Sequence, residues 1–159
     1  MYTGQIGLVP HPQTPAEHLI DWVTRSPVHH SVVAISETEC VSCEPGGALL
    51  RPLSRFPDAI WSHFDHTPAE TAGIVGWARA HVGAPYGWLQ FFAIGVALLT
   101  KTHTPDWLRR YLNSGKSFEC AQYCDAAYTA AGIYLFKDAV PSDVYPGMFV
   151  PIWGAHGWM

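Results

Sequence analysis

Basic side chains are scarce in this chain, and they do not form a continuous run. Its 159 residues contain nine Lys and Arg against thirteen Asp and Glu, which gives a formal net charge of −4. Arg109 and Arg110 are the only two basic residues that are adjacent in the sequence. Binding to nucleic-acid phosphates requires a basic stripe or patch. We therefore expect no nucleic-acid partner.

Long hydrophobic runs are also missing. The most apolar stretch, residues 89–99, would span as a helix only about half of a bilayer core, so it is too short to cross a membrane. Residues 1–7 have neither the positive segment nor the long apolar core of a signal peptide. We expect synthesis in the cytoplasm, with later release only through a phage or lysis system.

The chain has only four cysteines, Cys40, Cys43, Cys120 and Cys124. Four cysteines allow three disulfide pairings. Cys120 and Cys124 lie one helical turn apart, which suits reduced thiols in a reducing compartment better than a disulfide framework. Zinc held by these cysteines, or by residues 63–66, is the alternative. A C-x-x-C on a strand points its two sulfurs to opposite faces of the sheet, so we expect no metal site and no cofactor.

Three Thr-Pro pairs mark helix starts, because Thr is a good N-cap and Pro suits the first helical position. They begin at Thr14, Thr67 and Thr104, and Glu17 and Glu70 complete capping boxes at the first two. Helices are predicted near 15–25, 68–82, 105–113 and 118–131, and strands near 5–9, 31–36, 39–44, 49–53 and 148–153. This order predicts one α+β domain over residues 1–159, with an antiparallel sheet formed by the early strands.

Cys120 stands in the first turn of the last predicted helix and is the candidate nucleophile. Ser117 is the expected cap of this helix and Gly132 its C′ residue. The amide N–H groups and the dipole at a helix N-terminus favour an anion, so we expect the pKa of this thiol to lie below its free value of about 8.5. The alternative is that Cys120 is only a small buried core residue. Cys124, one turn further on, is expected to be core.

His30 is the candidate general base, because it begins a β-branched run, residues 31–35, that predicts a strand. We expect His30 to face the helix and His29 to face the other side of the strand. The next strand ends at Glu44 before a Pro-Gly-Gly turn, so its carboxylate is the candidate that orients the imidazole. Gln122 or a backbone carbonyl is the alternative for that role.

Four segments resemble the circularly permuted NlpC/P60 peptidases, which are papain-like cysteine hydrolases. Residues 26–30 (SPVHH) are similar to the family's "SP-aromatic-SHV" strand start, and residues 44–46 (EPG) to the end of its next strand. Residues 120–133 align without a gap to its pattern C-S-E-L-V-x-x-A-Y-x-x-A-G-I, and residues 82–88 are similar to its G-x-P-Y turn. The chain departs from the family after the cysteine, where the small polar residue and the Glu are replaced by alanine and glutamine.

The resemblance implies a papain-like permuted NlpC/P60 fold, in which a small antiparallel sheet or barrel packs on helices and the nucleophile begins a helix. Cys120, His30 and Glu44 would then cleave an amide bond through an acyl-enzyme, in a substrate such as a cell-wall peptide. The same resemblance makes Tyr86 a substrate contact, and we expect Trp88 beside it and Gln122 to contact the substrate too.

Residues 87–117 are a long connection between the G-x-P-Y turn and the nucleophile, and we interpret them as an insertion or lid. Within them, residues 89–99 form either a buried core helix or an exposed apolar surface that touches a membrane without crossing it. The second interpretation favours a lipid or thioester acyl hydrolase or acyltransferase. A non-catalytic binding module that keeps the fold is the third hypothesis.

Overall fold

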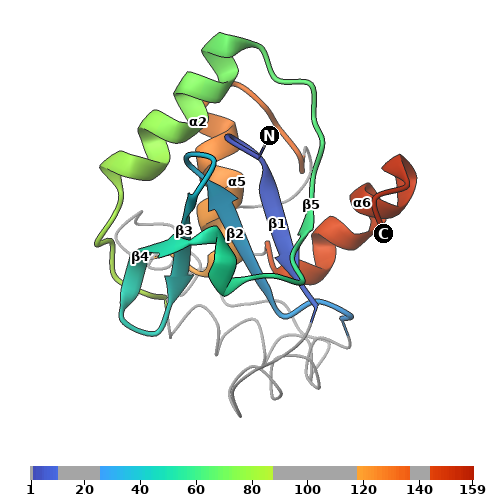
Figure 1. Cartoon of the computed structure of the whole chain (residues 1–159), viewed down its shortest axis with the longest axis horizontal. Helices are drawn as coiled ribbons and strands as arrows, with labels where there is room; N and C mark the ends of the chain where they lie inside the picture. Colours follow the sequence, from blue (N-terminus) through green and yellow to red (C-terminus); the bar gives the residue numbers. More distant parts are fainter. Residues whose placement is uncertain (1, 11–25, 88–117, 137–143) are drawn as a thin grey trace, which may run out of the picture.

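The computed structural model describes residues 2–10, 26–87, 118–136 and 144–159 (Figure 1). Two expected helices, near 15–25 and 105–113, lie outside the described residues. So do Trp88 and the apolar segment 89–99.

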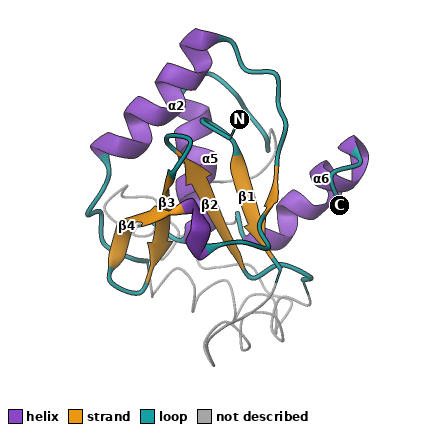
Figure 2. Ribbon diagram, in the orientation of Figure 1, coloured by secondary structure: helices purple, strands orange, loops and turns teal. Residues whose placement is uncertain are grey.

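A five-stranded antiparallel sheet forms the centre of the described structure (Figures 1 and 2). Its strands are β1 (Ile6–Val9), β2 (His30–Ala34), β3 (Glu39–Glu44), β4 (Gly47–Pro52) and β5 (Ile60–Trp61), in the spatial order β4-β3-β2-β1-β5. Val33 pairs with Ile6 on one side and with Val41 on the other, so β2 lies in the middle of the sheet. The four strands expected before residue 54 are confirmed, and the two-residue β5 was not expected.

Two α-helices pack against each other, and the second of them lies on one face of the sheet. α2 (Pro68–Ala80) begins with the expected capping box, in which Thr67 Oγ1 accepts from the Glu70 backbone N–H (3.2 Å) and Glu70 Oε2 accepts from the Thr67 backbone N–H (2.7 Å). α5 (Cys120–Ala130) ends as expected, since Gly132 follows it with a φ of 82°. The phenol O–H of Tyr123 donates to the Ala78 carbonyl (2.5 Å) and so ties α5 to α2.

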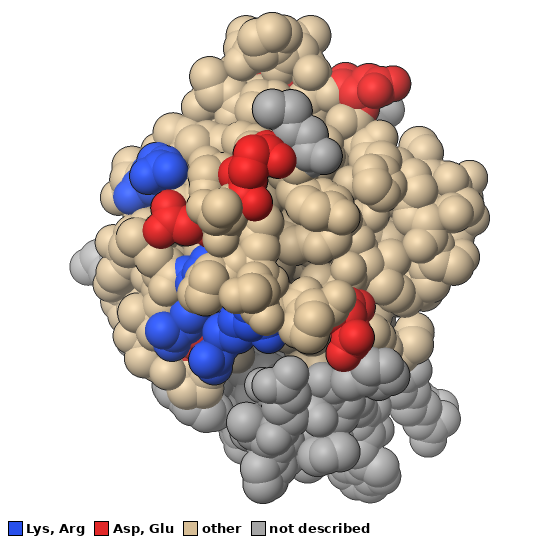
Figure 3. All heavy atoms as spheres, viewed as in Figure 1, with Lys and Arg blue, Asp and Glu red and all other residues tan. Residues whose placement is uncertain are grey.

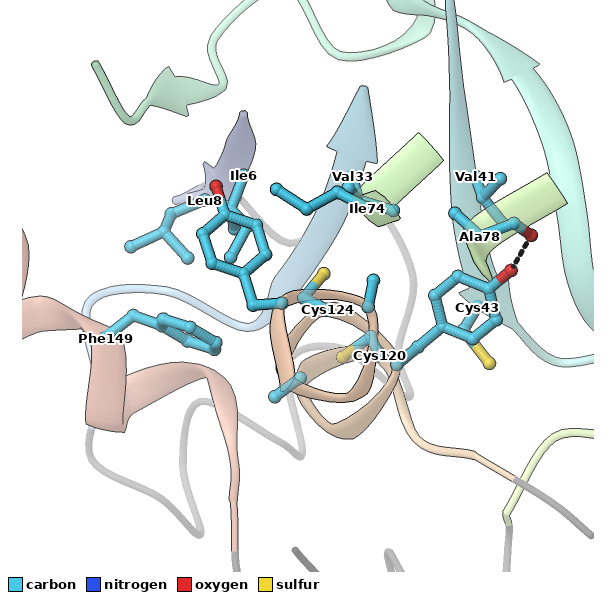
Figure 4. Close-up of a cluster of buried hydrophobic side chains, with 14 of the residues drawn as sticks. Ile6, Leu8, Val33, Val41, Cys43, Ile74, Ala78, Cys120, Cys124 and Phe149 are labelled. Atoms are coloured by element: carbon cyan, nitrogen blue, oxygen red, sulfur yellow. Dashed lines mark hydrogen bonds between the residues drawn. The ribbon is translucent and has the colours of Figure 1, made fainter. Parts of the chain in front are cut away.

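The sheet separates a large core cluster from a small one. In the large cluster, α5 packs against apolar side chains from four strands, from α2 and from the C-terminal region, and Figure 4 looks along this helix. They include Ile6, Leu8, Val33, Val41, Ile74 and Phe149. On the opposite face, the small cluster contains Val9, Val32, Cys40 and Phe56. Successive residues of a strand therefore serve different clusters, as the pleat requires.

The strand expected near 148–153 is wrong, because this region is helical. A 3₁₀ turn, η3 (Pro146–Phe149), leads into α6 (Val150–His156), and Gly157 ends the helix with a φ of 70°. Phe149 and Trp153, four residues apart, are both fully buried, which is the spacing of one helix face. Pro151 suits a first helical turn and cannot donate to a sheet. The sequence pattern did not reveal this helix, because a short apolar run is compatible with a strand or with a helix.

Candidate functional site

The candidate site is built around the first residue of α5. The N-cap of this helix is Glu119, whereas the expected cap Ser117 lies outside the described residues. Glu119 and Gln122 form a reciprocal capping box, in which the Glu119 carboxylate accepts from the backbone of the first turn and Gln122 Oε1 accepts from the Glu119 N–H (3.4 Å). Cys120 therefore begins the helix, as predicted, and its side chain is only 3% exposed.

The thiol of Cys120 lies between the helix start and the middle of the sheet (Figure 4). Its Sγ donates to Glu119 Oε1 across 3.3 Å, and it also forms a hydrogen bond with the backbone of Ser31 in β2. The thiols of Cys43 and Cys124 also lie near the Cys120 thiol. The Sγ of Cys124 donates to Ser31 Oγ (3.7 Å), so both cysteines of α5 contact the same residue of the sheet.

Burial raises the pKa of the Cys120 thiol well above its ordinary value, and the neighbouring Glu119 carboxylate raises it further. The hydrogen bond with the Ser31 backbone opposes this shift but does not reverse it. The expectation of a lowered pKa is therefore wrong for this conformation, because loss of hydration outweighs the helix terminus. Cys120 rests here as a protonated thiol, so a nucleophilic role would require a base that takes its proton.

Glu119 is a buried titratable group that the sequence analysis did not identify. It is 3% exposed, and burial raises the pKa of its carboxyl to about 7, against the hydrogen bonds from Cys120, Ala121 and Gln122 that lower it. The sequence held no standard signal for it, because the capping-box signature begins with Ser or Thr and not with Glu. A buried carboxyl beside a cysteine is the kind of perturbed group that collects at functional sites.

His30 lies on the face of the sheet opposite to α5. Ser31 and Val33 of β2 contact α5 or its core cluster, whereas Val32 belongs to the small cluster on the other face. The His30 ring follows Val32: its Nε2 lies 2.8 Å from Ser42 Oγ, and its centroid lies 6.0 Å from that of Phe56. The prediction that His30 faces α5 is therefore wrong. Side chains alternate between the two faces of a strand, and His30 shares the face of Val32 and not that of Ser31 and Val33.

His29 is the more deeply buried of the two histidines. It is 2% exposed, and its backbone N–H donates to the Val9 carbonyl (3.2 Å) just before β2 begins. Its ring is nearly parallel to that of His30, with centroids 6.5 Å apart. The pair immediately precedes Ser31, whose backbone contacts the Cys120 thiol. Of the two histidines, His29 therefore has the strand position that matches Ser31, whereas the His30 ring lies on the opposite face with Phe56.

Glu44 was expected to contact and orient the His30 ring, but its carboxylate contacts arginines instead. The side chain that contacts His30 is Ser42. The Glu44 carboxylate forms an ion pair with Arg51 Nε, and its Oε2 lies 3.5 Å from Arg55 Nη2. Figure 3 shows these basic side chains gathered over β4 and the 3₁₀ turn η1 (Leu53–Arg55). A guanidinium offers a carboxylate several charge-assisted donors, which explains this choice of partner. The sequence analysis missed Ser42, although its position on a neighbouring strand is compatible with the contact.

The predicted G-x-P-Y turn does lie beside the start of α5. Tyr86 and Phe118 form a parallel β-bridge, in which the Gly87 N–H donates to the Phe118 carbonyl (2.9 Å) and the Phe118 N–H to the Pro85 carbonyl (3.1 Å). The Sγ of Cys43 also donates to the Phe118 carbonyl (3.1 Å). The structure thus brings Tyr86, Gln122 and Cys120 into one region, while Trp88 lies outside the described residues.

Cys40 and Cys43 belong to opposite core clusters, as expected for a C-x-x-C on a strand. All four cysteines are free thiols. Within the described ranges, no group of three or more His, Cys, Asp or Glu side chains is placed to hold a metal ion. No helix in the same ranges has the length and apolar character needed to cross a bilayer.

Scans of the chain against models of known protein families and against curated protein sequences find no match.

Proposed function

We propose that this chain is a thiol-dependent hydrolase of papain-like, permuted NlpC/P60 type that cleaves an amide bond in a peptide, such as a cell-wall peptide. The observation that carries the proposal is the position of Cys120 at the first residue of α5, with its thiol against the Ser31 backbone directly after two histidines. A nucleophile at a helix start, with imidazole nearby, is the arrangement that cysteine-dependent acyl transfer requires.

The reaction begins when the Cys120 sulfur attacks the amide carbonyl carbon while an imidazole of the His29–His30 pair takes the thiol proton. The carbonyl oxygen becomes an oxyanion, which the backbone N–H groups at the start of α5 help to stabilise. The imidazolium then gives its proton to the amide nitrogen, the C–N bond breaks, and a thioester remains on Cys120. Water, deprotonated by the same imidazole, hydrolyses the thioester and restores the thiol.

The base comes from the histidine pair, and each member has a separate argument in its favour. His30 matches the family's base position, but its contact with Ser42 holds the ring on the face of the sheet opposite to α5. His29 lies two residues from Ser31, the interval after which strand side chains return to the same face, and it is almost completely buried. His29→Ala and His30→Ala therefore form a matched pair of variants that identifies the base.

The experiment that tests the proposal measures the cleavage of purified cell-wall peptides by mass spectrometry, with the parent chain and with Cys120→Ser. We expect the variant to lose at least about 10³-fold in kcat/KM, as for other lost nucleophiles. Cys124→Ser is the matched control, because it replaces a second buried thiol on the same helix and should keep most of the activity. Cleavage that survives in Cys120→Ser would rule out this mechanism.

A further inference from the structure

Two buried polar atoms of the capping box at the start of α5 make no hydrogen bond within the described structure. They are Oε2 of Glu119 and Nε2 of Gln122, in side chains that are 3% and 5% exposed. Leaving a buried donor or acceptor unpaired costs about 1–3 kcal/mol, so such atoms are rare in folded proteins and need an explanation. Here one acceptor and one donor remain unused on the same helical turn.

The capping box accounts for the positions of both side chains but not for these two atoms. It occupies Gln122 Oε1 and directs the Glu119 carboxylate toward the backbone of the first turn. The Cys120 thiol uses Glu119 Oε1. What remains is an anionic acceptor and a neutral donor, held by two residues that flank the nucleophile in the sequence and are locked to each other.

We propose that Glu119 and Gln122 recognise the amide group that Cys120 attacks, with Gln122 Nε2 donating to its carbonyl oxygen and Glu119 Oε2 accepting from its N–H. This inference rests on the proposed function and adds the chemical class that the site selects. A neutral amide offers one acceptor and one donor, and so matches both unused atoms. A carboxylate ligand offers acceptors only and meets the negative charge of Glu119, so the pair excludes it.

The test uses two small probes that differ in this one group, acetamide and acetate. Each is titrated at pH 8 into the ¹⁵N-labelled parent chain, and the side-chain NH₂ resonances of Gln122 are followed by NMR. Their assignment comes from through-bond correlations to the Gln122 backbone in the parent chain. We expect a saturable shift with acetamide and binding at least tenfold weaker with acetate. The parent titration does not depend on the folding of any variant.

The side chain of Gln5 is the internal control for this titration. It is also buried, but its amide is fully used: Nε2 donates to the Phe64 carbonyl (2.8 Å), and Oε1 accepts from Ser62 Oγ (2.7 Å) and the Phe64 N–H (3.0 Å). Its resonances should not move with either probe. In Glu119→Gln the repulsion is gone, so the preference for acetamide over acetate should fall toward unity.

The outcomes separate this inference from the proposed function. Gln122 resonances that do not respond to acetamide, in a chain whose Cys120 is needed for cleavage, would overturn amide recognition and leave the hydrolase. Selective shifts in a chain that cleaves nothing would support amide recognition, remove the catalytic proposal and favour a binding module. Equal binding of the two probes would also overturn the inference.

Discussion

The Sγ of Cys120 and Oε1 of Glu119, adjacent in the chain, share a hydrogen bond of 3.3 Å in the buried first turn of α5. A thiolate at this position would face the negative charge of its own neighbour. Proton loss from Cys120 is therefore linked to the protonation state of Glu119, and each makes ionisation of the other less favourable.

Glu119 should make the folded chain less stable as the pH rises. The pKa of its carboxyl increases from an ordinary 4.5 to about 7 on folding, so the folded state holds this proton more tightly. The stabilisation is fully present below about pH 4.5 and is lost as the pH rises through about 7. Urea unfolding should show that the parent loses about 3 kcal/mol between pH 4.5 and 8 that Glu119→Gln does not lose.

Asp125 provides the control for that experiment. Burial raises the pKa of its carboxyl to about 6, so it acts with the same sign but over a lower and narrower pH range. Asp125→Asn should remove a pH dependence that ends near pH 6 and leave the part near pH 7 unchanged. A parent whose stability is flat between pH 6 and 8 would contradict a buried, titrating Glu119.

Cys120 should alkylate slowly in the resting state. Because burial and Glu119 raise the pKa of its thiol, we expect labelling by iodoacetamide at pH 7 to be at least tenfold slower than in the urea-unfolded chain. Peptide mass spectrometry gives the rate for each cysteine. Glu119→Gln should speed the labelling of Cys120 more than that of Cys40, which belongs to the other core cluster. Fast labelling of the parent at pH 5 would instead indicate a preformed thiolate.

Ser42, more than Glu44, should control the imidazole of His30. The His30 Nε2 contact with Ser42 Oγ is 2.8 Å, whereas Glu44 is paired with Arg51 and Arg55. Ser42→Ala should therefore change the ring tautomer of His30, which NMR reads from its ¹⁵N chemical shifts. Glu44→Gln should mainly release the two arginines and change that tautomer less. A larger effect of Glu44→Gln would restore the carboxylate as the orienting group.

The Pro-Gly-Gly turn before β4 should tolerate a side chain at one glycine far better than at the other. Gly46 and Gly47 have φ values of 116° and 115°, so alanine is strained at both. A Cβ on Gly47 would also lie 2.7 Å from the Ala84 carbonyl oxygen, whereas at Gly46 the nearest atom is 3.8 Å away. Thermal unfolding should show Gly47→Ala to be less stable than Gly46→Ala by about 1–3 kcal/mol. Equal effects would mean that the turn can move away from Ala84.

The bond between Tyr123 and the Ala78 carbonyl should contribute measurably to the packing of α5 on α2. Tyr123→Phe keeps the ring but leaves the buried carbonyl without this donor, so we expect a loss of about 1–2 kcal/mol in unfolding free energy. Tyr134→Phe, at a side chain that is 64% exposed, is the matched control and should change stability by less than about 0.5 kcal/mol. Equal stability of the two variants would contradict a structural role for this bond.

Local signals predicted much of the fold. The Thr67–Glu70 box and the strand patterns carry their own short-range chemistry, so α2 and β1 to β4 could be predicted without tertiary information. The segment from Phe149 to Trp153 could not, because a few apolar residues suit a strand or a helix equally well until packing decides.

The site was harder to predict than the fold. It depends on which face of the strand a side chain occupies, on how deeply it is buried and on which of several neighbours it contacts. Cys120 was placed correctly from helix spacing, but its pKa depends on how much water reaches it. To predict the face of the sheet on which His30 lies, one needs to know how β2 pairs with β1 and β3. Glu44 could have contacted His30 from its sequence position, and only the structure shows that Arg51 and Arg55 take its carboxylate.

The bridge between Tyr86 and Phe118 means that the chain leaves the site and returns to it at the same point. Two backbone hydrogen bonds, from the Gly87 N–H to the Phe118 carbonyl and from the Phe118 N–H to the Pro85 carbonyl, hold the two ends together. This junction is a natural place for exchange: a short turn joining Gly87 to Phe118, or a foreign segment, could be grafted there while the start of α5 keeps its register. The start of α5 and the segment that precedes it can in this way be engineered separately.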